Sequence, residues 1–308
     1  MAHYLVTGGL GFIGTHLVRR LIDLDHDVTV LDDLSAGKEK NLVKGAKLVI
    51  GDIADESLVS SVLNDAKDGC FHLAAIPSVE RCLNEWPAVS QINVLGTISV
   101  FEACRKQVSP VPVVYASSAA VYGLHDGVAV ENIAVKPASS YGVDKLACEY
   151  YAHTAWHNYQ LPSVGLRFFN VYGPGQPKSS PYSGVITCFM HAYEQGKPVT
   201  IFGDGKQTRD FIYVGDIVDG CIAAMQSDNK TSEVYNLCTA HGASVLDIAL
   251  TMANIYGVEP VIEHQGARVG EVRHSLGASE KFRADIGAVS EPIALAAGLK
   301  KTVEPQSE

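Results

Sequence analysis

Residues 4–14 read YLVTGGLGFIG, and this stretch decides the fold of the N-terminal half of the chain. Its first four residues predict a buried strand, and the amphipathic pattern after it predicts a helix that reaches Leu24. Gly8, Gly11 and Gly14 lie at the turn between the two. There, glycines let the backbone approach a pyrophosphate at the positive end of a helix. The stretch therefore predicts a dinucleotide-binding turn, and a tight turn without a ligand is the alternative.

The same alternation of strand and helix continues to residue 170. We expect further strands at 28–31, 47–50, 69–73, 111–115 and 163–168, and helices at 55–66, 90–106 and 140–158. Units of this kind indicate an α/β fold with a Rossmann-like, doubly wound parallel sheet. The rhythm then breaks, so we expect a dinucleotide-binding domain over 1–170, to which a segment near 212–238 returns. The remainder of 171–308 would form a smaller C-terminal substrate-binding lobe.

The ends of the second and third predicted strands carry acids that suit an adenosine. Asp32 can accept hydrogen bonds from both ribose hydroxyls and would repel a 2′-phosphate. No arginine follows at once and Lys38 is distant, so NAD is favoured over NADP. Asp52 and Ile53 could meet the adenine, although Asp52 could equally be the N-cap of a helix.

Composition restricts the partners and the compartment. The 308 residues are 47% apolar and 19% charged, as in a soluble globular protein, with a net charge of −10 that disfavours nucleic acid and anionic membranes. An anionic ligand would need a local group of arginines and helix N-termini. Seven scattered cysteines indicate reduced thiols and the cytoplasm. We expect no signal peptide, no membrane-spanning segment and no metal site.

Residues 139–145 read SSYGVDK within a predicted helix. Residues four apart lie on one helical face, so Tyr141 and Lys145 point the same way. An ammonium near a phenol favours the phenolate and makes it a better base at neutral pH. The pair could therefore accept a proton, whereas a solvated face is the usual meaning of this spacing when it occurs alone.

Several motifs, taken together, identify a family resemblance. They are the glycine turn TGGLGFIG at 7–14, DI at 52–53, HLAA at 72–75, SSAAVYG at 117–123, YGVDK at 141–145, RFFNVYGP at 167–174, FGDGKQTRDF at 202–211 and RVGE at 268–271. In this order they resemble the extended short-chain dehydrogenase/reductase family, and within it the nucleotide-sugar 4-epimerases. The resemblance covers nearly the whole chain. It implies an isomerase that uses tightly bound NAD on a UDP-sugar.

This resemblance implies a role for each matching position. Tyr141 would be the general base, Lys145 would stabilise its phenolate and hold the nicotinamide ribose, and Ser118 would bind the reacting hydroxyl. The residues expected to contact NAD are Gly8, Gly11, Phe12, Ile13, Gly14, Asp32, Asp33, Asp52, Ile53, Leu73, Ala74, Ala75, Asn93, Ser117, Tyr141, Lys145 and Phe168. Those expected to contact the substrate are Ser78, Arg81, Ser118, Asn170, Phe202, Arg209, Arg268, Glu271 and Ser275.

The residues after Ser118 separate the reactions of this family. Its dehydratases and decarboxylases typically carry an acid there, whereas this chain has Ala119 and Ala120. One base and one hydroxyl suffice for a 4-epimerase that interconverts UDP-glucose and UDP-galactose through a transient 4-keto sugar. A dehydratase, a decarboxylase, a 4-keto reductase and a non-catalytic NAD-binding sensor are the alternatives.

Two further expectations follow from the resemblance. A bulky residue at the position of Ser275 would restrict the site to plain hexoses, so this serine leaves room for the 2-acetamido group of UDP-GlcNAc and UDP-GalNAc. An exposed Ser275 without such a role is the alternative. Helices 90–106 and 140–158 carry extensive apolar faces, which would pair in a homodimer or be covered within one chain.

Overall fold

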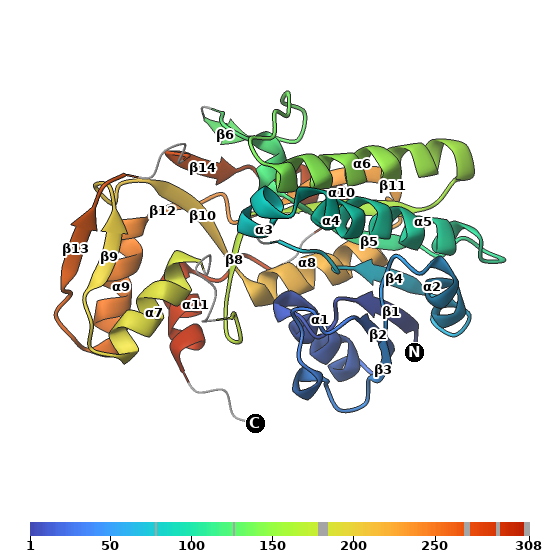
Figure 1. Ribbon diagram of the computed structural model, residues 1–308, viewed down its shortest axis with the longest axis horizontal. Helices are drawn as coiled ribbons and strands as arrows, with labels where there is room; N and C mark the ends of the chain where they lie inside the picture. The colour runs from blue at the N-terminus through green and yellow to red at the C-terminus, as the bar shows by residue number, and fades with distance from the viewer. Residues whose placement is uncertain (78, 126, 178–183, 268–271, 288–289, 305–308) are drawn as a thin grey trace.

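The computed structural model of the chain describes residues 1–308 except 78, 126, 178–183, 268–271, 288–289 and 305–308 (Figure 1). The strands are β1 (His3–Thr7), β2 (Asp27–Asp32), β3 (Lys47–Ile50), β4 (Gly69–His72), β5 (Val113–Ser118), β6 (Val128–Ala129), β7 (Ser163–Phe168), β8 (Asn170–Tyr172), β9 (Val199–Phe202), β10 (Thr208–Tyr213), β11 (Thr231–Leu237), β12 (Gly242–Ser244), β13 (Ile262–Gln265) and β14 (His274–Gly277). The α-helices are α1 (Phe12–Asp23), α2 (Glu56–Leu63), α3 (Val79–Asn84), α4 (Trp86–Ser90), α5 (Thr97–Arg105), α6 (Ser140–Tyr159), α7 (Val185–Glu194), α8 (Val214–Gln226), α9 (Val245–Tyr256), α10 (Glu280–Asp285) and α11 (Leu295–Val303). Shorter helical turns are η1 (Glu39–Asn41), the π-helical η2 (Gln91–Gly96) and η3 (Ala119–Tyr122).

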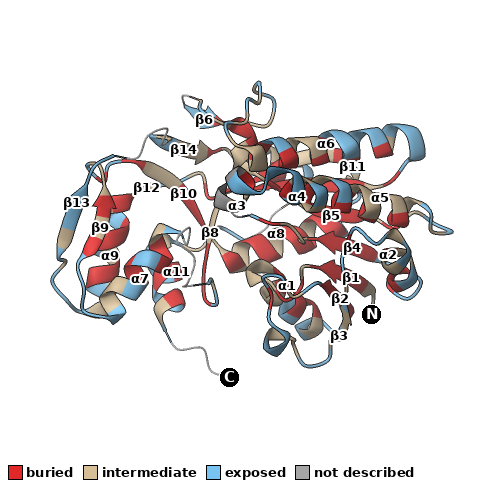
Figure 2. Ribbon diagram, in the orientation of Figure 1, coloured by how far each residue is buried: buried red, intermediate tan, exposed pale blue. Residues whose placement is uncertain are grey.

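The largest sheet has seven strands in the order β11-β7-β5-β4-β1-β2-β3, and every neighbouring pair runs parallel. Helices α1 and α8 pack on one face through a shared apolar core, and α2, α5 and α6 pack on the other. A parallel sheet covered on both sides needs apolar residues on both faces of its strands. Figure 2 accordingly shows the central strands as buried. The predicted Rossmann-like, doubly wound sheet is confirmed.

The C-terminal part adds two smaller sheets. One has the order β12-β10-β14-β6 with β8 beside β10, and the other pairs β13 with β9. Helices α7, α9 and α11 pack with β9 and β10 around a third apolar core, at the end of the molecule away from α2 (Figure 1). Strand β8 follows β7 almost directly and pairs with β10. This pairing places Asn170, just beyond the carboxyl end of β7, beside β10, the strand that carries Arg209.

Two predicted elements differ in detail. The expected helix at 90–106 starts earlier, at Trp86, with Pro87 in its first turn, and contains the π-helical turn η2 before α5. Strand β5 covers Val113–Ser118 rather than the expected 111–115, so it begins two residues later and ends three residues later. Among the described residues, no helix is long and apolar enough to cross a membrane.

Candidate active site

The glycine turn between β1 and α1 is packed backbone to backbone. Gly8 has φ +68°, and a Cβ on it would lie 2.8 Å from the backbone of Ala74. A Cβ on Gly14 would lie 2.2 Å from the carbonyl oxygen of Gly8. Helix α1 starts at Phe12 after Gly11, with no side-chain cap and no acid in its first turn. Its first N–H groups therefore suit an anion such as a pyrophosphate, as the sequence predicts for Gly8, Gly11, Phe12, Ile13 and Gly14.

Asp32 lies at the end of β2, beside this turn. Its two carboxylate oxygens accept hydrogen bonds from the backbone N–H groups of Leu10, at 3.0 Å, and Leu34, at 2.9 Å. Each oxygen keeps a second lone pair, so the held carboxylate can still accept two ribose hydroxyls. Asp33 instead accepts from the backbone and hydroxyl of Ser35. The turn and Asp32 together fit NAD.

The acid at the end of β3 does not cap the following helix. Asp52 accepts from the backbone N–H of Ala54, whereas Asp55 caps α2 by accepting from Leu58. The alternative of Asp52 as an N-cap is therefore wrong, because the helix starts three residues later. Ile53 is buried and packs against Gly96 of η2.

The π-helical turn η2 presents Asn93 to the loop after β4. Its carboxamide accepts from the backbone N–H of Ile76 at 2.8 Å and donates to the carbonyl of Ile76 and to the Asp144 carboxylate. These bonds engage both ends of the buried amide. Asn93 thus holds the segment that contains Leu73, Ala74 and Ala75 against α6.

The three predicted catalytic residues lie on β5 and α6. Lys145 is buried and its Nζ donates to the carbonyl of Ala116 at 2.9 Å, while lying 5.9 Å from the centre of the Tyr141 ring. Ser118 caps η3 by accepting from the N–H of Ala120 at 3.1 Å. The first turn of α6 packs on η3 so closely that a Cβ on Gly142 would lie 2.5 Å from the carbonyl oxygen of Ala120. Ser118 therefore sits at the junction with the helix that carries Tyr141 and Lys145.

Tyr141 lies beside the loop after β4. Its half-buried side chain packs against Ile76, Cys82 and Val89. Ser139, two residues earlier, accepts from Gly142 as the cap of α6 and lines a cavity. The tyrosine is thus next to the predicted NAD-contacting loop and two residues along the chain from the cavity wall, although it is not itself among the described residues that line the cavity.

The buried His72 ends β4 in a single tautomer. Its Nε2 lies 2.9 Å from the Thr97 hydroxyl and its Nδ1 lies 2.8 Å from the Thr7 hydroxyl. Because Thr97 gives its own proton to the carbonyl of Asn93, it accepts from Nε2–H, and Nδ1 accepts from Thr7. Burial, together with the positive charge of Lys145, lowers the pKa of His72 to about 3. The imidazole is therefore neutral at physiological pH.

A cavity of about 430 Å³ opens beside Ser118. Its lining residues come from four separate parts of the chain: Ser118, Ala119, Ala120, Tyr122, Gly123, Leu124, His125, Ala129, Ala138, Ser139, Phe168, Phe169, Asn170, Arg209, Val272 and Ser275. Five of the predicted site residues are among them, namely Ser118, Phe168, Asn170, Arg209 and Ser275. Ala119 and Ala120 line it as well, so methyl groups stand in the wall where the resemblance implies an acid for a dehydratase or decarboxylase.

Two polar substrate candidates of the cavity, Asn170 and Arg209, are held by hydrogen bonds to backbone carbonyls. Asn170 donates from its amide to the carbonyl of Asp210 at 2.9 Å, and Arg209 donates from Nη1 to the carbonyl of Thr208 at 2.9 Å. Arg209 and Ser275 lie side by side, because they are paired in the parallel register of β10 and β14. The wall made by Tyr122, Leu124 and His125 was not predicted. The sequence signal was Gly123, which follows Ser118 by five residues. A turn at this glycine keeps the next residues close to the end of β5 and so beside Ser118.

Three further candidates do not line the cavity. Arg81, on α3, forms an exposed ion pair with Glu85 at 2.9 Å. Phe202 ends β9 outside the set of described residues that line the cavity, and the Ser117 hydroxyl is turned to Glu149. Ser78, Arg268 and Glu271 lie outside the described residues. Among the residues that the structure does describe, no group of three or more potential ligands could hold a metal ion.

Comparisons with known proteins agree with this geometry. The model of the NAD dependent epimerase/dehydratase family matches residues 4–238. A UDP-glucose 4-epimerase of Mycolicibacterium smegmatis is 34% identical over 306 residues, which are 97% of each chain. A solved UDP-N-acetylglucosamine 4-epimerase from Methanobrevibacter ruminantium, in complex with UDP-N-acetylmuramic acid, superposes with TM-score 0.93 at 33% identity, over 98% of this chain and 97% of that one. A Thermus thermophilus UDP-glucose 4-epimerase with NAD gives TM-score 0.89 at 31% identity, with 98% and 97% coverage.

Proposed function

We propose, from the premise that this chain belongs to the NAD dependent epimerase/dehydratase family, that it is a UDP-sugar 4-epimerase with NAD as cofactor. The observation that carries the proposal is the junction of β5 and α6, where Ser118 meets the helix of Tyr141 and Lys145 beside a cavity lined by alanines. In this arrangement Tyr141 can accept one proton and Ser118 can bind one hydroxyl. The arrangement suits the inversion of a single carbinol centre better than an elimination, which needs a further acid.

In this proposal Tyr141 moves a proton at the sugar O4. As phenolate it takes the proton from the 4-hydroxyl, and it returns the proton to the 4-keto oxygen later. The Lys145 ammonium, held by the carbonyl of Ala116, stabilises the phenolate, and Ser118 Oγ orients the sugar oxygen. When bound, NAD would supply a hydride acceptor for C4 in the first half-reaction and a hydride donor in the second.

We place the UDP diphosphate at Arg209 and Asn170. A guanidinium is suited to bidentate contacts with phosphate oxygens, and the acidic chain needs such a local positive charge for an anionic substrate. The intermediate must turn over between its two half-reactions, and a diphosphate held at this point leaves the sugar free to rotate in the cavity.

A neutral hexose fits the cavity. Among the described residues that line it, Arg209 is the only lysine or arginine, and we assign it to the diphosphate. The remaining described wall carries alanines, aromatic rings and hydroxyls, which suit a sugar with a 6-hydroxyl. Glucose and galactose are therefore the proposed pair, and the small Ser275 supports their 2-acetamido counterparts as further substrates.

The test is conversion of UDP-glucose to UDP-galactose, resolved by proton NMR, at unchanged substrate mass and without added NAD. Tyr141→Phe is expected to lower kcat by about 10²- to 10⁴-fold while bound NAD is retained, since general acid–base catalysis is lost. Tyr159→Phe, at the exposed far end of the same helix, is the matched control with unchanged turnover. Loss of substrate mass, or no turnover of any UDP-hexose by the parent, would contradict the proposal.

We further propose a cytoplasmic homodimer joined through η2 and α6. Five large apolar side chains there are exposed to solvent: Leu95, Val143, Tyr150, Tyr151 and Tyr159. Such a surface is typical of a helix pair that meets its copy. Tyr150→Glu is expected to yield monomers in analytical ultracentrifugation, whereas Leu250→Glu, on the exposed side of α9, should leave the mass unchanged. The seven free cysteines support a reducing compartment.

A further inference from the structure

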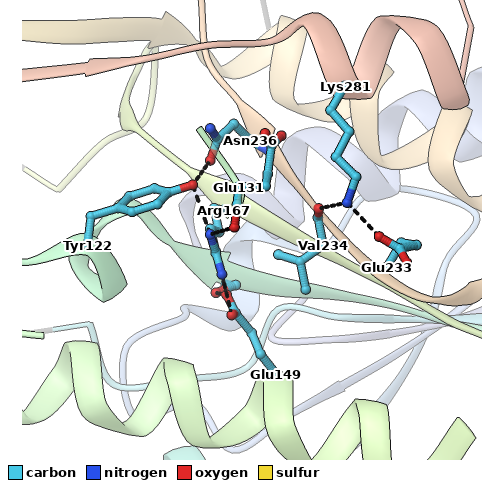
Figure 3. A network of polar contacts seen from close by, with 9 residues as sticks. Tyr122, Glu131, Glu149, Arg167, Glu233, Val234, Asn236 and Lys281 are labelled. Carbon is cyan, nitrogen blue, oxygen red and sulfur yellow. Dashed lines mark hydrogen bonds and ion pairs between the residues drawn. The ribbon is translucent and has the colours of Figure 1, made fainter. Parts of the chain in front are cut away.

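A buried ion pair joins helix α6 to strand β7 (Figure 3). Arg167 donates from Nε to Glu149 Oε1 at 2.8 Å and from Nη2 to Oε2 at 2.7 Å, and both side chains are 6% exposed. Glu149 follows Lys145 by one helical turn and Tyr141 by two, so the three share a face of α6. Arg167 therefore binds α6 on the same helical face that carries the proposed catalytic residues.

The carboxylate of this pair also holds the end of β5. Ser117 donates from its hydroxyl to Glu149 Oε1 at 2.5 Å. One turn earlier on α6, Lys145 donates to the carbonyl of Ala116. Helix α6 is thus fastened to two consecutive residues of β5, immediately before Ser118.

The guanidinium of the pair holds the cavity wall that follows Ser118. Arg167 donates from Nη1 to the Tyr122 hydroxyl at 2.8 Å, and this hydroxyl donates to Asn236 Oδ1 on β11 at 2.6 Å (Figure 3). Tyr122 ends η3, the turn that Ser118 caps, and it lines the cavity. Asn236 in turn donates to the carbonyl of Ala129, another lining residue.

We propose that the Arg167–Glu149 pair is the positioning element of this active site. Ser118 lies between two anchored residues, Ser117 on the carboxylate and Tyr122 on the guanidinium. The planar fork of the arginine therefore sets the spacing of Ser118 from the Tyr141–Lys145 face and from the sugar cavity. This inference rests on the proposed function, because the spacing matters only if these groups act on one substrate.

Stability alone does not account for the pair. Replacing a buried ion pair by apolar residues of similar volume is often neutral or stabilising, whereas removing one partner leaves a costly unpaired charge. The double variant Glu149→Leu with Arg167→Met therefore separates the two roles. A pair needed only for stability would be replaced without loss of turnover, while a positioning pair would not.

The double variant is expected to fold, to retain NAD and to keep KM for UDP-glucose within about twofold, while kcat falls about 10- to 100-fold through misplacement of Ser118. A matched double variant, Arg283→Met with Glu291→Leu, removes an exposed bidentate pair and should leave kcat unchanged. Tyr115→Phe removes a buried β5 hydroxyl that has no partner among the described residues, and it should also be neutral. Full kcat in the folded Glu149/Arg167 variant would overturn the proposal.

Two further measurements keep the outcome decisive. Amide hydrogen exchange at Ala120, whose N–H is bonded to Ser118 Oγ, should be faster in the double variant, and this readout needs no turnover. If the parent epimerises no UDP-hexose, the proposed function fails and amide exchange alone decides the positioning role. If the double variant does not fold, Tyr122→Phe decides, with a several-fold lower kcat expected and an unchanged kcat contradicting the proposal.

Discussion

The proposed cofactor crevice, formed by the turn at 8–14 and the loop after β4, and the proposed sugar cavity beside Ser118 are built in different ways. The closest contacts at the turn of the crevice are between backbone segments: Gly8 meets the backbone of Ala74, and Gly14 meets that of Gly8. The cavity is made of side chains from segments more than a hundred residues apart, such as Ser118 and Ser275. Backbone atoms in contact cannot move aside for an added methyl group. A cavity lined by side chains, in contrast, changes its volume gradually as the side chains change in size. Substitutions in the crevice should therefore act abruptly, and substitutions in the cavity gradually.

The largest effect is expected for Gly14→Ala. The new methyl group would lie 2.2 Å from the Gly8 carbonyl oxygen and 2.7 Å from the Gly9 Cα, and neither backbone atom can rotate away. We expect loss of bound NAD and a loss of roughly 3 kcal/mol in stability, at the upper end of overpacking effects. Nucleotide released on denaturation and a urea titration measure the two. Gly266→Ala is the control, because its Cβ would meet nothing within 4 Å. A Gly14→Ala protein with normal NAD content would show that substitutions in the crevice do not act more abruptly than those in the cavity.

The same contrast explains what could be predicted from sequence. The alternation of strands and helices and the turn at 8–14 are local patterns, and the structure confirms the fold class that they indicate. The helix spacing of Tyr141 and Lys145 is local too, and both residues lie on α6 as expected. Local patterns suffice where a function depends on neighbours in the chain.

The rest could not be predicted because it depends on contacts between distant segments. Nothing in the sequence shows that Arg167 would meet Glu149 and Tyr122, or that Tyr122 would line the cavity. The sequence likewise does not show that Arg81 would form an ion pair with Glu85, and the contact of Arg81 with the substrate stays a prediction. Charge identifies an anion-binding residue only after the fold has placed it.

Within the cavity, the largest effect should come from Arg209→Leu. Loss of a charge-assisted contact to the substrate diphosphate is expected to raise KM for UDP-glucose about 100-fold, or ~2.7 kcal/mol, with kcat changed less. Steady-state kinetics measure this, and isothermal titration with UDP gives the same ratio without catalysis. Lys206→Leu removes a positive charge three residues away that does not line the cavity, and its KM should stay within about twofold. If the two variants raised KM equally, Arg209 would act only through the general electrostatic attraction of the substrate and not through a direct contact.

The crevice also predicts a pH dependence. The pKa of His72 is lowered to about 3 in the folded chain, first by burial and then by Lys145, whereas an unfolded histidine titrates near 6.5. Between these values the unfolded state binds one more proton, so stability rises with pH and is lost on acidification from 6.5 toward 3. About 2 kcal/mol should be lost by pH 5 from this group.

Urea titrations between pH 7 and 5 measure the slope. His72→Gln should lower stability at pH 7 but flatten the slope by about one proton. His157→Gln, on the exposed side of α6, should keep the slope of the parent. If His72→Gln left the slope of unfolding free energy against pH unchanged, another group would cause the loss of stability in acid. The prediction for His72 would then be wrong.

The smallest effect, and the most graded, is expected for Ser275→Tyr. Ser275 is half-buried at the cavity, in register with Arg209, so a larger side chain there would reduce the volume available to the sugar. We expect kcat/KM for UDP-GlcNAc to fall about tenfold, or ~1.4 kcal/mol, while that for UDP-glucose changes less than about threefold. The two substrates compared on one protein control for any change in fold. A parallel fall for both would indicate that the tyrosine disturbs Arg209 rather than the space beside the sugar, and the cavity would then respond as abruptly as the crevice.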